Sequence, residues 1–282
     1  MPEEEEGTSV AKKKIVKRKK EKASQAAAPG PAADRGAGAW RDGDIPPEHG
    51  GASGAHAALT EISDEQLERI LSDHREWITS KAKGGKRAEL GKANLREGYL
   101  QGAQLRGADL REANLQKAEL QNADLFLADL RGVDLLEAQL QKAILKRCKL
   151  GKATLMSARL EEADLEEANL VRADLREADL REANLQGADL GGANLQGANL
   201  FMAEARNTKM ANASLQGADL KGADFMHADL QGARMMGAKM QGTELKGANL
   251  KGADLTDVTG LTAEQLGEAE IDDTTVKPAN LA

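Results

Sequence analysis

A five-residue period runs through the chain from Lys86 to Asp257 without one insertion or deletion. Its centre falls on every multiple of five from Leu90 to Leu255, and 29 of these 34 centres are Leu. The residue two before the centre is Ala 29 times, and nothing larger than Val occurs there. A period of five fits neither the 3.6 residues of a helix turn nor the alternation of a strand. The repeat therefore predicts a solenoid.

A square coil explains the period. If each repeat forms one side, its Leu and Ala point inward, and four repeats, or 20 residues, close one turn. Residues 20 apart then stack on neighbouring coils, as cross-strand neighbours do in a sheet. Seven such corner pairs carry opposite charges and three carry like charges. The opposite pairs are Lys92/Glu112, Glu97/Lys117, Lys117/Glu137, Lys142/Glu162, Lys146/Glu166, Arg147/Glu167 and Glu161/Arg181.

The runs Ala108-Asp109-Leu110-Arg111-Glu112 and Ala193-Asn194-Leu195-Gln196-Gly197 resemble the pentapeptide repeat family. The resemblance covers about 170 of the 282 residues. It implies an all-β solenoid, namely a right-handed quadrilateral β-helix whose central Leu side chains stack in columns. At four repeats a coil, 34 repeats give about 8.5 coils. With ~4.8 Å between layers, these coils form a rod about 40 Å long.

Four regions follow from the pattern. Residues 1–57 contain Pro, Gly, Ala and charge without apolar periodicity, which predicts a disordered tail. Residues 58–85 are expected to hold an N-terminal capping helix, which starts with a capping box at Ser63 and Gln66 and ends at Gly84 and Gly85. Residues 86–258 form the repeat, and residues 259–282 form a C-terminal cap and tail.

Both ends of a solenoid expose an open layer that needs a cover. At the first coil, one stripe of the expected helix provides it, through Leu67, Ile70, Leu71, His74, Trp77 and Ile78. On this stripe, His74 is expected to be a packed residue. At the far end, a short helix over residues 262–266 is predicted to cover the core with Leu261 and Leu266, and residues 271–281 to add an extended segment.

The predicted tail contains a basic run. Its members are Lys12, Lys13, Lys14, Lys17, Arg18, Lys19, Lys20 and Lys22, against the single acid Glu21. Such a run favours weak binding to nucleic acid, to an anionic membrane surface or to a nuclear import receptor. Aromatic residues that would stack on bases are missing from it. The alternative is a solvated tail that keeps the protein soluble or binds its own acidic neighbours, Glu3 to Glu6.

The residues of the repeat predict no enzyme, no cofactor and no metal site. Cys148 replaces an inward Ala, and the four His residues are scattered along the sequence. The carboxylates point outward at regular intervals, so nothing desolvates them as an acid/base site requires. The sequence has no run of about 18 apolar residues that would span a membrane, and it predicts a cytoplasmic monomer.

Two classes of function remain. The first is a non-enzymatic scaffold whose rod presents flat faces to a protein partner. The second comes from the family resemblance, because some members regulate type II topoisomerases by imitating duplex DNA. A DNA mimic needs a strong negative field, whereas the repeat holds 24 basic and 26 acidic residues. Nucleic-acid binding through the basic tail is a further alternative.

The outward residues change along the repeat. Of the 19 repeats centred on Leu90 to Leu180, three have Gly two after the centre, and ten of the next 14 do. Near residue 205 the small centre Ala205 breaks the Leu column. The four-sided scheme places apolar corners beside an acidic strip there, which predicts a protein-docking surface. Its candidate residues are Phe201, Met202, Glu204, Asp224, Met226 and His227.

Overall fold

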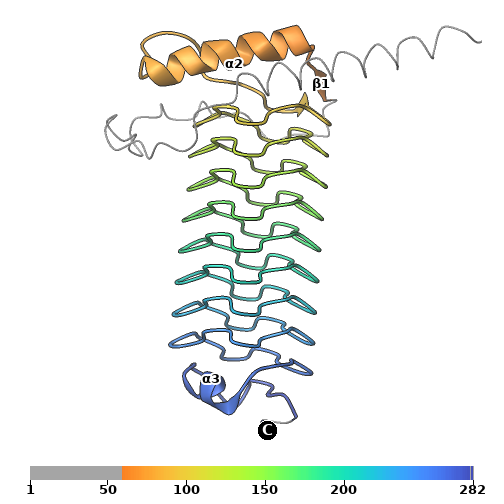
Figure 1. The fold of residues 1–282 in the computed structure, drawn as a ribbon, viewed down its shortest axis with the longest axis vertical. Helices are drawn as coiled ribbons and strands as arrows, with labels where there is room; N and C mark the ends of the chain where they lie inside the picture. Colours follow the sequence, from red (N-terminus) through yellow and green to blue (C-terminus); the bar gives the residue numbers. More distant parts are fainter. Residues whose placement is uncertain (1–58, 280, 282) are drawn as a thin grey trace, which may run out of the picture. The chain divides into compact units, whose positions relative to one another are not determined.

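The computed structural model describes residues 59–279 and residue 281. Its named elements are β1 (Thr60–Glu61), α2 (Asp64–Thr79), β2 (Ala93–Asn94) and α3 (Ala263–Gly267). The repeat lies between α2 and α3 as a stack of coils (Figure 1). Apart from β1 and β2, each side of a coil contributes a single bridging residue. The predicted tail, including its basic run, falls outside the described residues.

The bridges confirm that four repeats make one turn. The residue before each centre pairs in parallel with the residue 20 positions later, from Glu89 with Asp109 to Lys239 with Thr259. Leu90 N–H donates to the carbonyl of Asp109 at 2.7 Å, and Asp109 N–H donates to the carbonyl of Ala88 at 2.9 Å. The same pair of bonds recurs along the repeat. Backbone polar groups are thus satisfied between coils, without long strands.

Each corner is a tight turn with one left-handed residue. Ala93 N–H donates to the carbonyl of Leu90 at 3.1 Å, which closes the turn, and Lys92 has φ 59°. All 34 residues at the position of Lys92 have positive φ, and 21 of them are not Gly. A type II turn requires positive φ at its third residue. The turn geometry is therefore imposed by the coil even where the residue type disfavours it.

The interior is a column of Leu and Ala side chains. Leu105 and Ala108 are fully buried, as are their equivalents in nearly every repeat. Two polar residues replace Ala and donate to equivalent backbone carbonyls, each 23 residues earlier in the chain. Cys148 donates to the carbonyl of Leu125 at 2.7 Å, and Thr243 donates to the carbonyl of Leu220 at 2.8 Å. Burial raises the pKa of the Cys148 thiol above its usual range. Cys148 is thus a core residue, as expected.

Helix α2 begins as predicted and ends earlier. Ser63 and Gln66 form the capping box, but the helix stops at Thr79 rather than at the glycine pair. Ser80 Oγ then holds the loop by accepting from Gly84 N–H at 2.8 Å. A Cβ on Gly85 would lie 2.2 Å from the carbonyl of Asp73. The glycines therefore permit a close return of the loop past α2, which the sequence pattern did not distinguish from a helix end.

The predicted stripe of α2 packs on the first coil. His74 and Trp77 are buried, and Leu67, Ile70 and Leu71 pack against the core. His74 stacks on Trp77 with ring centroids 5.4 Å apart, and its Nδ1 accepts from Ala88 N–H at 3.0 Å. Burial lowers the pKa of His74 from 6.5 to about 4. His74 is therefore a neutral, packed residue at ordinary pH.

Neighbouring segments add parts of a layer at both ends. Strand β1, which the sequence analysis did not predict, pairs in parallel with β2. After the regular repeat, Glu270 pairs with Asn249 and Val276 with Asp254. Between the last repeat and Glu270, α3 begins at Ala263 with Thr262 as its N-cap, close to its predicted position, and buries Leu266. The chain thus continues the layer beyond the last repeat by replacing one side with a helix.

Candidate protein-binding surface

The four sides of the coil differ in charge. We number them faces 1 to 4 by the first centre on each, which are Leu90, Leu95, Leu100 and Leu105. Face 4 carries the bridging residues Gln104, Asp124, Ile144, Asp164, Asn184, Glu204, Asp224 and Glu244. Of these eight described residues five are acidic and none is basic, whereas the bridging residues of each other face include at least one Lys or Arg. Face 4 is therefore the most consistently acidic side.

Phe201 and Met202 form an exposed apolar corner between faces 3 and 4. Phe201 is 42% exposed and Met202 is 53% exposed. Met202 has φ 59°, and a Cβ on Gly222 in the next coil would lie 2.8 Å from its Sδ. The Met202 side chain thus lies over position 222 of the next coil, where Gly leaves room for it. The location agrees with the prediction that these two residues face solvent.

The other predicted residues line face 4 and its opposite corner. Glu204 bridges to Asp224 and accepts from Gln186 Nε2 at 2.7 Å. Arg206 forms an ion pair with Asp224. Asp224, and more weakly Glu244 and Glu204, raise the pKa of Arg206. Arg206 is therefore paired with Asp224, and Glu244 and Glu204 act on it only at longer range.

Met226 and His227 occupy the corner between faces 4 and 1. Met226 is half-buried, and His227 is exposed and lies over Gly247. The structure therefore brings all six predicted residues to one face and its two corners. The partly buried Met226 gives the second corner less apolar surface than the sequence predicts. Their role as a docking surface stays a prediction.

Most of the predicted charge pairs are ion pairs. Six of the seven lie within 4.0 Å, for example Lys142 with Glu162 at 3.2 Å and Arg147 with Glu167 at 2.6 Å. The others are Lys92/Glu112, Lys117/Glu137, Lys146/Glu166 and Glu161/Arg181. The dense charges near residues 142–167 thus satisfy one another between coils. They form a ladder of ion pairs between neighbouring coils.

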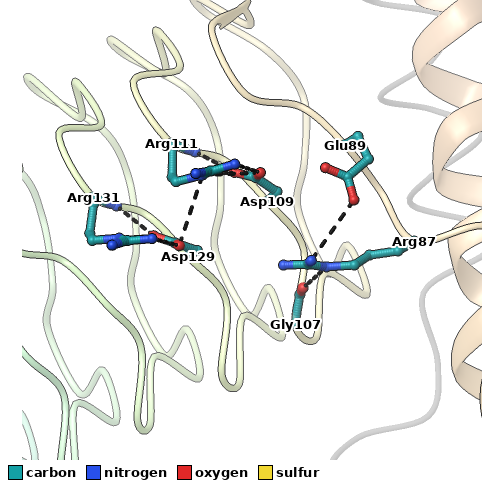
Figure 2. A network of polar contacts seen from close by, with 7 residues as sticks. All are labelled: Arg87, Glu89, Gly107, Asp109, Arg111, Asp129 and Arg131. Carbon is teal, nitrogen blue, oxygen red and sulfur yellow. Dashed lines mark hydrogen bonds and ion pairs between the residues drawn. The ribbon is translucent and has the colours of Figure 1, made fainter. Parts of the chain in front are cut away.

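A second polar network on face 1 was missed by the sequence analysis (Figure 2). Arg111 Nε donates to Asp109 Oδ1 at 2.9 Å, and its guanidinium lies 3.9 Å from Asp129. Burial would raise the pKa of Asp109, but the bonds from Arg111 outweigh it and hold that pKa below its usual value. Arg131 binds Asp129 in the same way at 2.8 Å. The signal was present as the triplet Asp-Leu-Arg, in which the two charged residues flank a centre.

Arg87 extends this network to the start of the repeat. Its Nε donates to the carbonyl of Gly107 at 2.6 Å, and its guanidinium lies 3.9 Å from Glu89. Asp109 and Asp129 are only 5% and 3% exposed. These carboxylates are occupied by guanidinium groups, so the network stabilises the first coils and offers little to a ligand.

Residues 59–279 contain no group of three His, Cys, Asp or Glu side chains arranged to hold a metal ion. Neither α2 nor α3 has the length and apolar character needed to cross a membrane.

Comparison with known proteins agrees with the geometry. The family model described as pentapeptide repeats, in eight copies, matches overlapping segments that together run from residue 88 to residue 257. The chain belongs to the pentapeptide repeat family. No curated protein sequence matches this pentapeptide repeat protein.

Solved structures of other family members are similar to it. HetL, a pentapeptide repeat protein from the cyanobacterium Nostoc sp. strain PCC 7120 involved in heterocyst differentiation regulation, is 30% identical over 76% of this chain and 99% of HetL, with a TM-score of 0.35. A pentapeptide repeat protein from the Arabidopsis thaliana thylakoid lumen is 39% identical over 36% of this chain and 67% of its own, with a TM-score of 0.21. QnrB1, a plasmid-mediated fluoroquinolone resistance protein, is 20% identical over 59% and 88%, with a TM-score of 0.37.

Proposed function

We propose that this pentapeptide repeat protein is a non-enzymatic scaffold that binds a protein partner on the side of its coil. The observation that supports this most directly is the exposed pair Phe201 and Met202 beside acidic face 4. Adjacent exposed apolar residues rimmed by polar ones are typical of protein-interaction sites. Met adapts to varied partner surfaces because its side chain is flexible and polarisable.

The interior and the ion-pair ladders support a passive rod. Leu and Ala fill the coils, so the repeat offers no deep pocket between its layers, and catalysis needs converging groups in such a pocket. The right-handed sense, about 8.5 coils, the capping roles of α2 and α3, a monomeric state and a cytoplasmic location are further parts of this proposal.

Regulation of a type II topoisomerase by DNA mimicry is the weaker candidate. Many acidic side chains in the N-terminal half of the repeat are bound to a neighbouring Lys or Arg, as Glu162 and Asp109 are. Such pairing weakens the long-range negative field that a mimic requires. Polyanion binding by the tail is independent of both, and its steep salt dependence would identify it.

An affinity capture tests the scaffold proposal. The full chain and the variant Phe201→Asp/Met202→Asp would serve as baits, with Gln101→Asp/Asn122→Asp as a charge-matched control at the same corner of earlier coils. We expect an identified partner to be retained by the wild type and the control and lost by the corner variant, with unchanged melting temperatures. Failure of the wild type to retain any protein above background would overturn the proposal.

A further inference from the structure

Face 4 ends in a groove at the C-terminal end of the repeat. The groove has a volume of about 510 Å³ and lies between residues 241–244 of the last regular coil and α3, with Gly260 in its wall. Its acidic lining residues are Glu244, Glu264 and Glu268. None of these three carboxylates forms an ion pair within residues 59–279. The groove therefore continues the acidic column of face 4.

The groove is held in shape by buried contacts. Gln265 Nε2 donates to the carbonyl of Thr243 at 2.7 Å, in place of the backbone N–H that the next coil would supply. Leu266 is buried against the core. The walls thus need little ordering when a ligand binds, which lowers the entropic cost of association.

Charges are segregated around the Phe201 and Met202 corner. Arg181 and Lys221, which stack on either side of Phe201, are directed to face 3 by Asp179 at 2.7 Å and Asp219 at 3.5 Å. Towards face 4 the chain instead presents Glu204, Asp224, Glu244, Glu264 and Glu268, against the two cations Arg206 and Lys246. The carboxylates of face 4 would therefore attract a cationic partner, whereas the cations directed to face 3 would repel it.

From these observations we propose that face 4, from the Phe201 and Met202 corner to the α3 groove, binds an extended cationic segment of the partner protein. An apolar side chain of the segment seats on Met202, and Lys or Arg side chains reach Glu244, Glu264 and Glu268. Three layers of ~4.8 Å separate the corner from α3. An extended chain covers this distance of about 14 Å in four to five residues. The proposal rests on the scaffold function and specifies its partner.

The probe is a fluorescent eight-residue peptide, Lys-Leu-Lys-Ser-Lys-Leu-Lys-Ser, titrated with the full chain at low salt. We expect Glu204→Gln/Glu244→Gln/Glu268→Gln to weaken binding at least tenfold. The matched control, Glu97→Gln/Glu137→Gln/Glu177→Gln, removes equal charge from the corner between faces 2 and 3, and we expect less than a twofold change. Equal weakening in both variants, or in neither, would overturn the proposal.

The apolar contact is tested separately with Met202→Gly, which suits the positive φ at this corner. This change should weaken the Leu peptide several-fold and leave a peptide with Ser in place of Leu unaffected. An identical effect on both peptides would exclude a contact between Met202 and the Leu side chain of the peptide. Self-association that is lost in the face 4 variant would instead assign the face to a second copy and overturn the proposal.

The two proposals fail in different ways. If the chain still captures its partner after the triple substitution of Glu204, Glu244 and Glu268, the scaffold function stands and the assignment of face 4 is wrong. If the peptide binds as expected but the full chain retains no protein partner, face 4 keeps its specificity for cationic segments and the scaffold function is wrong.

Discussion

The N-terminal and C-terminal halves of the repeat share one backbone but have different corners. In the 19 repeats centred on Leu90 to Leu180, 16 of the left-handed corner residues are not Gly, and in the next 14 only four are not Gly. Yet φ at these corners is similar, for example 56° at Glu162 and 66° at Gly217. The coil therefore fixes the backbone, and the sequence decides how the corner strain is offset.

The two halves offset that strain in different ways. A left-handed residue with a Cβ costs roughly 1–2 kcal/mol. In the N-terminal half long side chains stack between coils and form ion pairs, such as Lys117 with Glu137 at 3.5 Å. In the C-terminal half Gly removes the strain and also removes the ladder. Two of the four exceptions, Met202 and His227, lie over Gly222 and Gly247, so a long side chain there depends on a bare position in the next coil.

The largest expected effect should be equal in both halves, because they share a core. Leu125 and Leu220 are both almost fully buried. Truncation of either to Ala removes packing and leaves a cavity, so we expect Leu125→Ala and Leu220→Ala each to lower the free energy of unfolding by about 3–4 kcal/mol. Chemical denaturation measures both. A difference above ~2 kcal/mol would show that the halves differ inside as well as at their corners.

Acidification should act on the N-terminal end. The folded pKa of His74 is about 4, below its usual 6.5, so the unfolded chain binds more protons between these values. The contribution of His74 is fully present above pH 6.5 and is lost as the pH falls to about 4. A change of this size corresponds to at most ~3 kcal/mol. Amide exchange of Ala88, which donates to His74, should lose protection in this window.

His74→Gln is the matched control for this pH effect. Its side-chain carbonyl can accept from Ala88 N–H without titrating, so the loss of protection between pH 6.5 and 4 should disappear. The bonds that lower the pKa of Asp109 act at lower pH, because that contribution is lost only as the pH falls through the carboxyl range. Equal acid sensitivity in wild type and His74→Gln would remove His74 as the cause.

Smaller effects are expected at single corners. Gly217 has φ 66° and open space around its missing side chain, so Gly217→Ala should lower the free energy of unfolding by only about 1 kcal/mol. Gly217→Asn should lower it less, because Asn tolerates this conformation. In contrast, a Cβ on Gly260 would lie 2.8 Å from the backbone N of Gln241. Similar melting temperatures for Gly217→Ala and Gly260→Ala would contradict this distinction.

The smallest effect concerns salt. Exposed ion pairs contribute a few tenths of a kcal/mol each, and the Debye length falls from about 10 Å at 0.1 M salt to about 3 Å at 1 M. We therefore expect 1 M salt to reduce amide protection slightly in coils around Glu162 and to leave coils around Gly217 unchanged. Hydrogen exchange resolved by residue measures the two regions in one sample. A uniform change along the repeat would show that the ladders carry no net stability.

The repeat itself determined the coil. Leu and Ala at fixed positions in a period of five admit one way to bury both, which is why the 20-residue stacking, six ion pairs and the capping box at Ser63 were predictable. The candidate surface was predictable to the same extent, since register alone places Phe201 and Asp224 relative to one another. The Asp109 and Arg111 pair was visible as a triplet, but the 20-residue spacing indicates only pairs across coils.

Contacts between distant segments needed the tertiary structure. The sequence cannot show that β1 pairs with β2, that α2 stops at Thr79, or that α3 leaves a groove beside Glu244, because the repeat pattern ends before each of these segments. Within the repeat, every residue has a partner set by its number. Outside it, a segment is placed by which apolar surface it covers and which backbone groups it satisfies, and those depend on the folded coil.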